Sequence, residues 1–168
     1  MSRPSWENSL TQTLKRPPHK PPQRVVILGM GHELRGDDAP GLVIAQHLRP
    51  LANDSWLVIE GGHAPENHTS TIRHFQPDFV LFIDAAQMNA RPGTIRWLSW
   101  PETMGLSAST HTMPPYMLAH YLQQDLGCDI ALIGIQPAVN TLDVPLSADV
   151  QMAVNTLTKA LLQIMTAS

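Results

Sequence analysis

The most constraining feature of the sequence is a series of short apolar runs that alternate with segments of helical spacing. The strongest run, FVLFID at 79–84, is apolar up to its terminal aspartate, which is typical of a strand buried on both faces. Further strands are predicted at 24–29, 56–60, 93–98 and 129–135, and helices at 40–48, 67–74, 113–126 and 147–165. This alternation predicts a three-layer α/β/α sandwich around a mostly parallel twisted sheet of about five strands. The 93–98 run alternates between apolar and polar residues, so we expect an antiparallel edge strand there.

The first 23 residues differ in composition from the rest of the chain. They are basic, and Pro17, Pro18, Pro21 and Pro22 exclude a regular helix around them. We therefore expect residues 1–23 to form a disordered, proline-rich tail and residues 24–168 to form one α/β domain. An alternative interpretation of the prolines is a polyproline docking segment.

The charge and the apolar content of the chain exclude several classes of protein. The net charge is −3, and residues 1–24 carry five basic side chains against one acidic, which leaves −7 for the remainder. So acidic a domain is a poor candidate for binding nucleic acid. The single cysteine, Cys128, excludes an intramolecular disulfide, and no apolar stretch approaches the roughly 18 residues of a membrane span. Because residues 2–23 also lack the apolar core of a signal peptide, we expect a cytoplasmic protein without membrane insertion.

Polar side chains gather where the predicted strands end, at the edge where ligands bind in parallel sheets. Asp84 ends the 79–84 strand, Asp38 precedes the helix at 40–48, and His111 precedes the helix at 113–126. Two carboxylates and one imidazole suit a divalent first-row metal with open coordination positions. A metal-free alternative uses the carboxylates as general acid and base in peptide hydrolysis. The neighbouring Asp37 is expected to serve the start of the helix at 40–48.

Three structural explanations compete with this site. An aspartate after a strand often accepts backbone hydrogen bonds in a turn, an aspartate before a helix often caps it, and a single loop histidine is usually exposed. The glycine-containing segment GMGHELRGDD at 29–38 is neither a P-loop, since it lacks Gly-Lys-Ser/Thr, nor a dinucleotide-binding fingerprint, since Leu34 occupies the place of the third glycine. The sequence therefore does not indicate nucleotide binding.

Several blocks of the sequence resemble one known family. The segment VVILGMGHELRGDDAPG at 25–41 resembles the N-terminal signature of the [NiFe]-hydrogenase maturation endopeptidases, a strand followed by G-N-x-L-x-x-D-D-G-x-G. The blocks GGHAPEN at 61–67, LFIDAAQM at 81–88, STHTMP at 109–114 and LIGIQP at 132–137 look like those of the formate-hydrogenlyase-type (hydrogenase 3) branch. The resemblance covers about residues 24–160 in the expected order.

The resemblance implies a specific activity. It implies a cytoplasmic hydrolase, an endopeptidase that removes a C-terminal extension from the nickel-loaded precursor of a [NiFe]-hydrogenase large subunit, with a metal-dependent or aspartic-type mechanism. Carried over by motif, the family's catalytic and nickel-contacting residues fall on Asp38, Asp84 and His111. The nickel is expected to be that of the precursor, and the free protein is expected to be a monomer. An alternative of another class is a non-catalytic, nickel-centre-sensing or chaperone-like binding protein of the same fold.

Three further residues are candidates for positioning the substrate: Gln136, Glu66 and His32. Two positions depart from the family pattern. His32 replaces the usual asparagine, and Ala39 replaces the glycine after the aspartate pair. We expect His32 to supply an extra ligand or to alter the cleavage chemistry, and Ala39 to restrict the turn through its Cβ atom.

Overall fold

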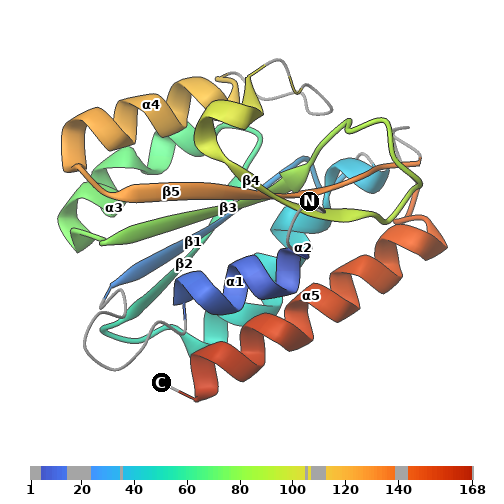
Figure 1. Ribbon diagram of the computed structural model, residues 1–168, viewed down its shortest axis with the longest axis horizontal. Helices are drawn as coiled ribbons and strands as arrows, with labels where there is room; N and C mark the ends of the chain where they lie inside the picture. The colour runs from blue at the N-terminus through green and yellow to red at the C-terminus, as the bar shows by residue number, and fades with distance from the viewer. Residues whose placement is uncertain are drawn as a thin grey trace.

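The protein folds around a five-stranded sheet with the strand order β2-β1-β3-β5-β4 (Figure 1). The computed structural model describes residues 5–14, 24–34, 36–104, 106, 113–138 and 144–167. Neighbouring strands pair in parallel except for the last pair, in which β4 runs antiparallel to β5 at the edge of the sheet. The strands are β1 (Val25–Met30), β2 (Trp56–Gly62), β3 (Phe79–Ala85), β4 (Ile95–Ser99) and β5 (Asp129–Ile135).

Helices cover both faces of this sheet (Figure 1). One face carries α1 (Trp6–Leu14), α2 (Pro40–Leu48) and α5 (Ala148–Thr166), and the other carries α3 (Thr69–Phe75) and α4 (Pro115–Leu126). Short 3-10 turns occur at η1 (Gly36–Asp38), η2 (Arg49–Leu51), η3 (Pro65–His68) and η4 (Trp100–Thr103). The predicted three-layer α/β/α architecture with one antiparallel edge strand is confirmed.

Two apolar clusters form the core, one on each face of the sheet. In β3, Leu81 and Ile83 belong to the cluster under α1, α2 and α5, whereas Val80 and Phe82 belong to the cluster under α3 and α4. Successive side chains of a strand point to opposite faces. Asp84 therefore continues the row of Val80 and Phe82 and lies on the α3–α4 side.

The connections around β1 place a topological switch point at one end of the sheet, the position of the ligand-binding crevice in open α/β folds. The chain leaves β1 through η1 and α2, reaches β2 on one side of β1, and then crosses through α3 to β3 on the other side. The strand order thus reverses between β1 and β3. In open α/β sheets such a switch point, outside the carboxyl ends of the strands, is where ligands bind.

Two glycines let α2 approach the sheet closely. A Cβ atom on Gly41 would overlap the carbonyl oxygen of Ile83, and one on Gly29 would overlap the carbonyl oxygen of Gly41. Because any side chain at these positions would push α2 away from β1 and β3, the pair holds the start of α2 against the strand ends. The η1 turn, which directly precedes α2, is thereby held at the crevice.

The N-terminal segment differs from the expected disordered tail. Residues Trp6–Leu14 form α1, and Leu10 and Leu14 are buried in the core at 1% and 7% exposure, with Trp6 packed against the same cluster. These three residues are spaced four apart and so share one face of the helix. The prolines that exclude a helix begin only at Pro17, after α1 has ended. The remainder of the 1–23 segment lies outside the described residues.

Smaller differences concern element ends. The helix predicted at 67–74 is divided into η3 and α3, and the helix predicted from residue 113 begins at Pro115, with Pro114 as its N-cap residue. Within the described ranges, no helix has the length and apolar character needed to cross a membrane.

Candidate functional site

Asp38 is placed by a turn that folds back over the end of β1. Asp38 is 1% exposed, and its backbone carbonyl oxygen accepts a hydrogen bond from the backbone N–H of His32 (3.2 Å). Gly31 has φ +138°, and a Cβ atom there would overlap the same carbonyl oxygen. Only glycine combines this backbone conformation with such a close approach. Gly31 therefore lets η1 lie on the strand end with Asp38 buried.

Asp84 is the other buried carboxylate at this edge. It occupies the end of β3, where it is in register with Gly134 of β5, and it is 1% exposed. The η1 turn, which contains Asp38, contacts β3. The structure thus places Asp84 near the carboxyl end of β3 and Asp38 on a turn that contacts the same strand. Both carboxylates are buried, and a buried charge is costly unless partners surround it.

His111 is the third predicted member of the site. His111 lies outside the described residues, and in the sequence it precedes Pro115, the first residue of α4, by four positions. Among the residues that the structure describes, no three His, Cys, Asp or Glu side chains are arranged to hold a metal ion. The two carboxylates are suitable hard ligands for a divalent metal, but as a pair they need a further donor to complete the set.

Asp37 has a different role from the one expected. The N-cap residue of α2 is Ala39, with no side-chain capping bond, so Asp37 does not cap that helix. Its carboxylate instead accepts hydrogen bonds from the N–H of Ala138 (2.7 Å), the N–H of Ser147 (2.7 Å) and the hydroxyl of Ser147 (2.8 Å). Ser147 is the N-cap residue of α5. Asp37 therefore serves the start of a helix, but that helix is α5.

Gln136 organises the chain that follows Asp84. It is 4% exposed, and its Oε1 atom accepts a hydrogen bond from the N–H of Met88 (2.7 Å), while its Nε2 atom donates to Oε1 of Gln87. Its backbone N–H donates to the carbonyl oxygen of Thr94 (2.9 Å). These contacts support the segment after β3 from inside the protein. Direct contact of Gln136 with a substrate stays a prediction.

His32 and Glu66 lie on the connections that follow β1 and β2. His32 is half-buried, and its ring lies 5.4 Å from that of His63, centroid to centroid, with a 30° interplanar angle. The backbone N–H of Leu34 donates to its Nδ1 atom (3.2 Å), which leaves Nε2 to carry the proton of the neutral ring. Both histidines line a cavity of about 320 Å³ together with Glu33 and Glu60. Glu66 is half-buried in η3, after β2.

The backbone conformation at Ala39 does not require glycine. Ala39 has φ −98° and ψ −4°, a negative φ that residues with a Cβ atom adopt, and it is 5% exposed. The expected restriction of the turn is therefore not a source of strain.

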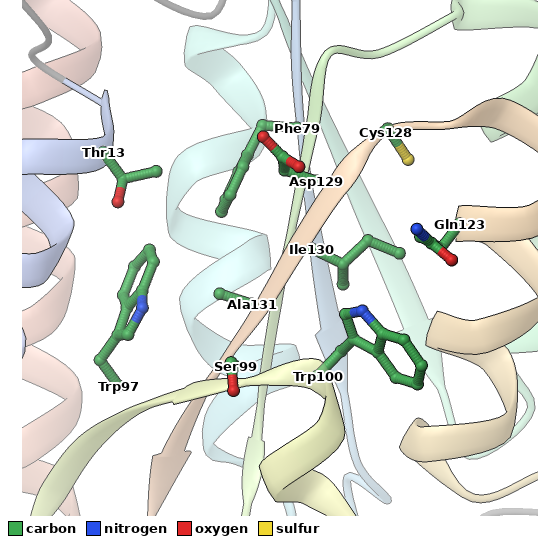
Figure 2. Close-up of a pocket in the computed structure, with 10 residues that line it drawn as sticks. All are labelled: Thr13, Phe79, Trp97, Ser99, Trp100, Gln123, Cys128, Asp129, Ile130 and Ala131. Carbon is green, nitrogen blue, oxygen red and sulfur yellow. The ribbon is translucent and has the colours of Figure 1, made fainter.

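A further cavity, which the sequence did not indicate, lies at the opposite end of the sheet. It measures about 270 Å³ and is lined by residues at the starts of β3 and β5, among them Phe79 and Asp129 (Figure 2). Figure 2 shows Trp97 and Trp100 on opposite sides of this cavity, with Cys128 and Gln123 on the same side as Trp100. Burial raises the pKa of the Cys128 thiol to about 11. A neutral, buried thiol is a poor nucleophile, and the cavity is separate from the carboxylate edge.

Comparisons with known proteins agree on one family. The family model for HycI, the hydrogenase maturation protease, matches residues 43–164. The hydrogenase 3 maturation protease of Escherichia coli K12 is 34% identical over 133 residues, which are 78% of this chain and 84% of that protein. A crystal structure of a [NiFe] hydrogenase maturation protease, HycI, from Thermococcus kodakarensis KOD1 superimposes with a TM-score of 0.83 at 30% identity, covering 94% of this chain and 99% of the other. The solution structure of the HycI endopeptidase of Escherichia coli gives 0.72 at 32% identity, covering 81% and 87%.

Proposed function

This chain belongs to the hydrogenase maturation protease family, and we propose on that basis that it is an endopeptidase acting on a hydrogenase precursor. Its substrate is the nickel-loaded precursor of a [NiFe]-hydrogenase large subunit, from which it removes a C-terminal extension. The reaction takes place in the cytoplasm, and the free enzyme is a monomer.

The observation that carries this proposal is the pair of buried carboxylates at the switch point of the sheet. Asp38 and Asp84 are each 1% exposed; Asp38 lies on the turn that follows β1, and Asp84 lies at the carboxyl end of the neighbouring strand β3. In the proposal they contact the nickel centre of the precursor together with the imidazole of His111. Two carboxylates and an imidazole form a donor set that suits a divalent first-row metal, and they leave positions open for the precursor's own ligands.

The enzyme's residues contribute mainly by orientation. Asp38, Asp84 and His111 hold the metal centre of the precursor so that the scissile bond lies in the crevice between β1 and β3. Fixing the reacting groups in this way removes much of the entropic part of the barrier. Nickel in this position can polarise a water molecule or the scissile carbonyl group.

A second mechanism uses the same two carboxylates without the metal in the chemical step. One of them, Asp38 or Asp84, accepts a proton from the water that attacks the scissile carbonyl carbon. The proton then passes to the departing amine when the C–N bond breaks. Both mechanisms require the two carboxylates at one edge of the sheet.

The test is a cleavage assay on purified large-subunit precursor. The precursor is prepared with and without nickel, incubated with the protein, and measured by intact-mass spectrometry. We expect loss of the C-terminal extension from the nickel-loaded precursor only. A stable complex with nickel-loaded precursor that never loses mass would contradict the proposal and favour the non-catalytic binding protein.

A further inference from the structure

The structure assigns Asp37 a positioning role: we infer that its carboxylate fastens η1 to the start of α5 and thereby sets the place of Asp38. This inference rests on the proposed function, because it gives the neighbouring Asp38 a part in cleavage. It differs from the role expected of Asp37 at the start of α2. Asp37 is not a catalytic residue in this view, since it acts through its neighbour.

The contacts of Asp37 are numerous and short for a single side chain. The residue is fully buried at 0% exposure. One carboxylate oxygen accepts from the N–H of Ser147 at 2.7 Å, and the other accepts from the N–H of Ala138 at 2.7 Å and from the hydroxyl of Ser147 at 2.8 Å. Hydrogen bonds to a charged acceptor are shorter and stronger than neutral ones. Both oxygens therefore hold segments that follow β5 and precede α5.

The partner of Asp37 is a rigid element. The N-cap residue Ser147 makes no side-chain capping bond to α5, and its hydroxyl donates to Asp37. The carboxylate thus lies at the N-terminus of α5, where the helix dipole favours a negative charge. Five residues of this helix are at most 4% exposed and belong to the core cluster on this face of the sheet: Val150, Val154, Leu157, Leu161 and Met165.

Asp38 is consequently held from both sides. On the β1 side, the N–H of His32 donates to its carbonyl oxygen (3.2 Å), and Gly31 lies against the same oxygen. On the other side, the adjacent Asp37 ties η1 to α5. Within η1, the N–H of Ala39 donates to the carbonyl oxygen of Gly36 (3.1 Å), so the turn moves as a unit. Releasing Asp37 would let this unit shift relative to Asp84 at the end of β3.

The decisive variant is Asp37→Asn, compared with Asp78→Asn. Asparagine is close to aspartate in size, but it has one acceptor oxygen where the carboxylate has two. Its NH₂ group therefore replaces an acceptor and faces an N–H or hydroxyl donor, so hydrogen bonds are lost. Asp78 is the control because its Oδ2 atom also accepts a backbone N–H bond, from Arg24 (3.0 Å), but it is exposed and lies beside the start of β3. At a temperature where circular dichroism shows both variants folded, we expect kcat for precursor cleavage to fall about 10- to 100-fold in Asp37→Asn, with KM within about 2-fold. Asp78→Asn should retain the wild-type kcat.

Two variants of the partner test the contact itself. Ser147→Ala removes the hydroxyl and should lower kcat by a smaller factor, whereas Ser147→Thr keeps a hydroxyl and should restore it. A role confined to stability would instead lower the melting temperature in Asp37→Asn and leave kcat of the folded enzyme unchanged. That result would overturn the inference.

A measurement without substrate separates this inference from the proposed function. Hydrogen exchange of the His32 and Ala39 amides reports on the two backbone bonds that hold Asp38 in place. We expect Asp37→Asn to speed the exchange of both amides while the central strands stay protected. Unchanged exchange at both amides would overturn the inference even if the wild-type enzyme cleaves. Faster exchange in Asp37→Asn than in the wild type, together with a wild-type protein that does not cleave, would support the positioning and reject the proposed function.

Discussion

The carboxylate of Asp37 and the hydroxyl of Ser147, 110 residues apart in the sequence, lie 2.8 Å from each other. The adjacent Asp38 is also buried, but it lies over the end of β1, where its carbonyl oxygen accepts a hydrogen bond from the N–H of His32. Two consecutive aspartates therefore have different surroundings. Asp37 is bonded to backbone and hydroxyl donors near the start of α5, and Asp38 lies against the chain that leaves β1.

The first prediction concerns the two carboxylates at the crevice. Asp38→Asn and Asp84→Asn should each lower the rate of precursor cleavage by about 10²-fold or more, because a carboxylate that contacts the reacting centre also sets its geometry. Asparagine is close in size, so the folded structure should persist in both variants. Cleavage is measured by the appearance of the shortened large subunit, and folding by circular dichroism.

Asp54→Asn is the matched control for these two variants. Asp54 is exposed and lies shortly before β2, at the other end of the sheet from the crevice. The Asp54→Asn variant should cleave the precursor at the wild-type rate. A wild-type rate in folded Asp38→Asn or Asp84→Asn would show that this carboxylate has no part in the reaction.

The second prediction concerns His111. His111→Ala should abolish detectable cleavage, because it removes the only imidazole of the proposed donor set. His74→Ala, which removes an exposed histidine of α3, should have no effect on the rate. Binding of nickel-loaded precursor, measured by surface plasmon resonance, should also weaken in His111→Ala. If the two alanine variants cleave equally fast, the third ligand must be another residue.

The third prediction concerns α1. Leu10→Ala should lower the free energy of unfolding by about 2–5 kcal/mol, because Leu10 is 1% exposed and its loss leaves a cavity beneath the helix. Thr11→Ala, at the next and exposed position of the same helix, should change it by less than about 0.5 kcal/mol. Urea unfolding followed by tryptophan fluorescence measures both. Equal stability of the two variants would mean that α1 does not pack on the core in solution.

The fourth prediction concerns the pH dependence of stability through Cys128. Burial raises the pKa of its thiol from about 9 to about 11, so the folded protein keeps the proton when the unfolded chain has lost it. The stabilising contribution of the neutral thiol is therefore complete below pH 9 and is lost as the pH rises from about 9 to 11. The free energy of unfolding should fall over this range, and it should fall less steeply in Cys128→Ala.

Alkylation provides an independent check on Cys128. At pH 8 the native thiol should react with iodoacetamide much more slowly than the thiol of urea-unfolded protein, because the reactive form is the thiolate. Mass spectrometry counts the added groups, and Cys128→Ala gives the unreactive background. Rapid labelling of the folded protein would show that the thiol is accessible and that its pKa is not raised.

The elements that carry the candidate site could be predicted from the sequence. The helix Pro40–Leu48 and the strand Asp129–Ile135 have the predicted bounds, and Phe79–Ala85 differs from its prediction by one residue. Apolar periodicity determines these elements because it is a local property of a few consecutive residues. The same reasoning placed Asp84 at a strand end and Asp38 before a helix, which brings them to one edge in any parallel α/β sheet.

Contacts between distant segments were decided only by the tertiary structure. The apolar stripe of Trp6, Leu10 and Leu14 becomes a buried helix face only because α5 and the sheet offer a surface that covers it. Likewise, no local pattern distinguishes Asp37 from a cap of α2. Its partners, Ala138 and Ser147, are 101 and 110 residues away and reach it only once β5 and α5 have packed on the sheet. The hydrogen-bond donors of a buried carboxylate are set by the segments that the folded chain brings next to it. The residues adjacent in the sequence do not determine which segments these are.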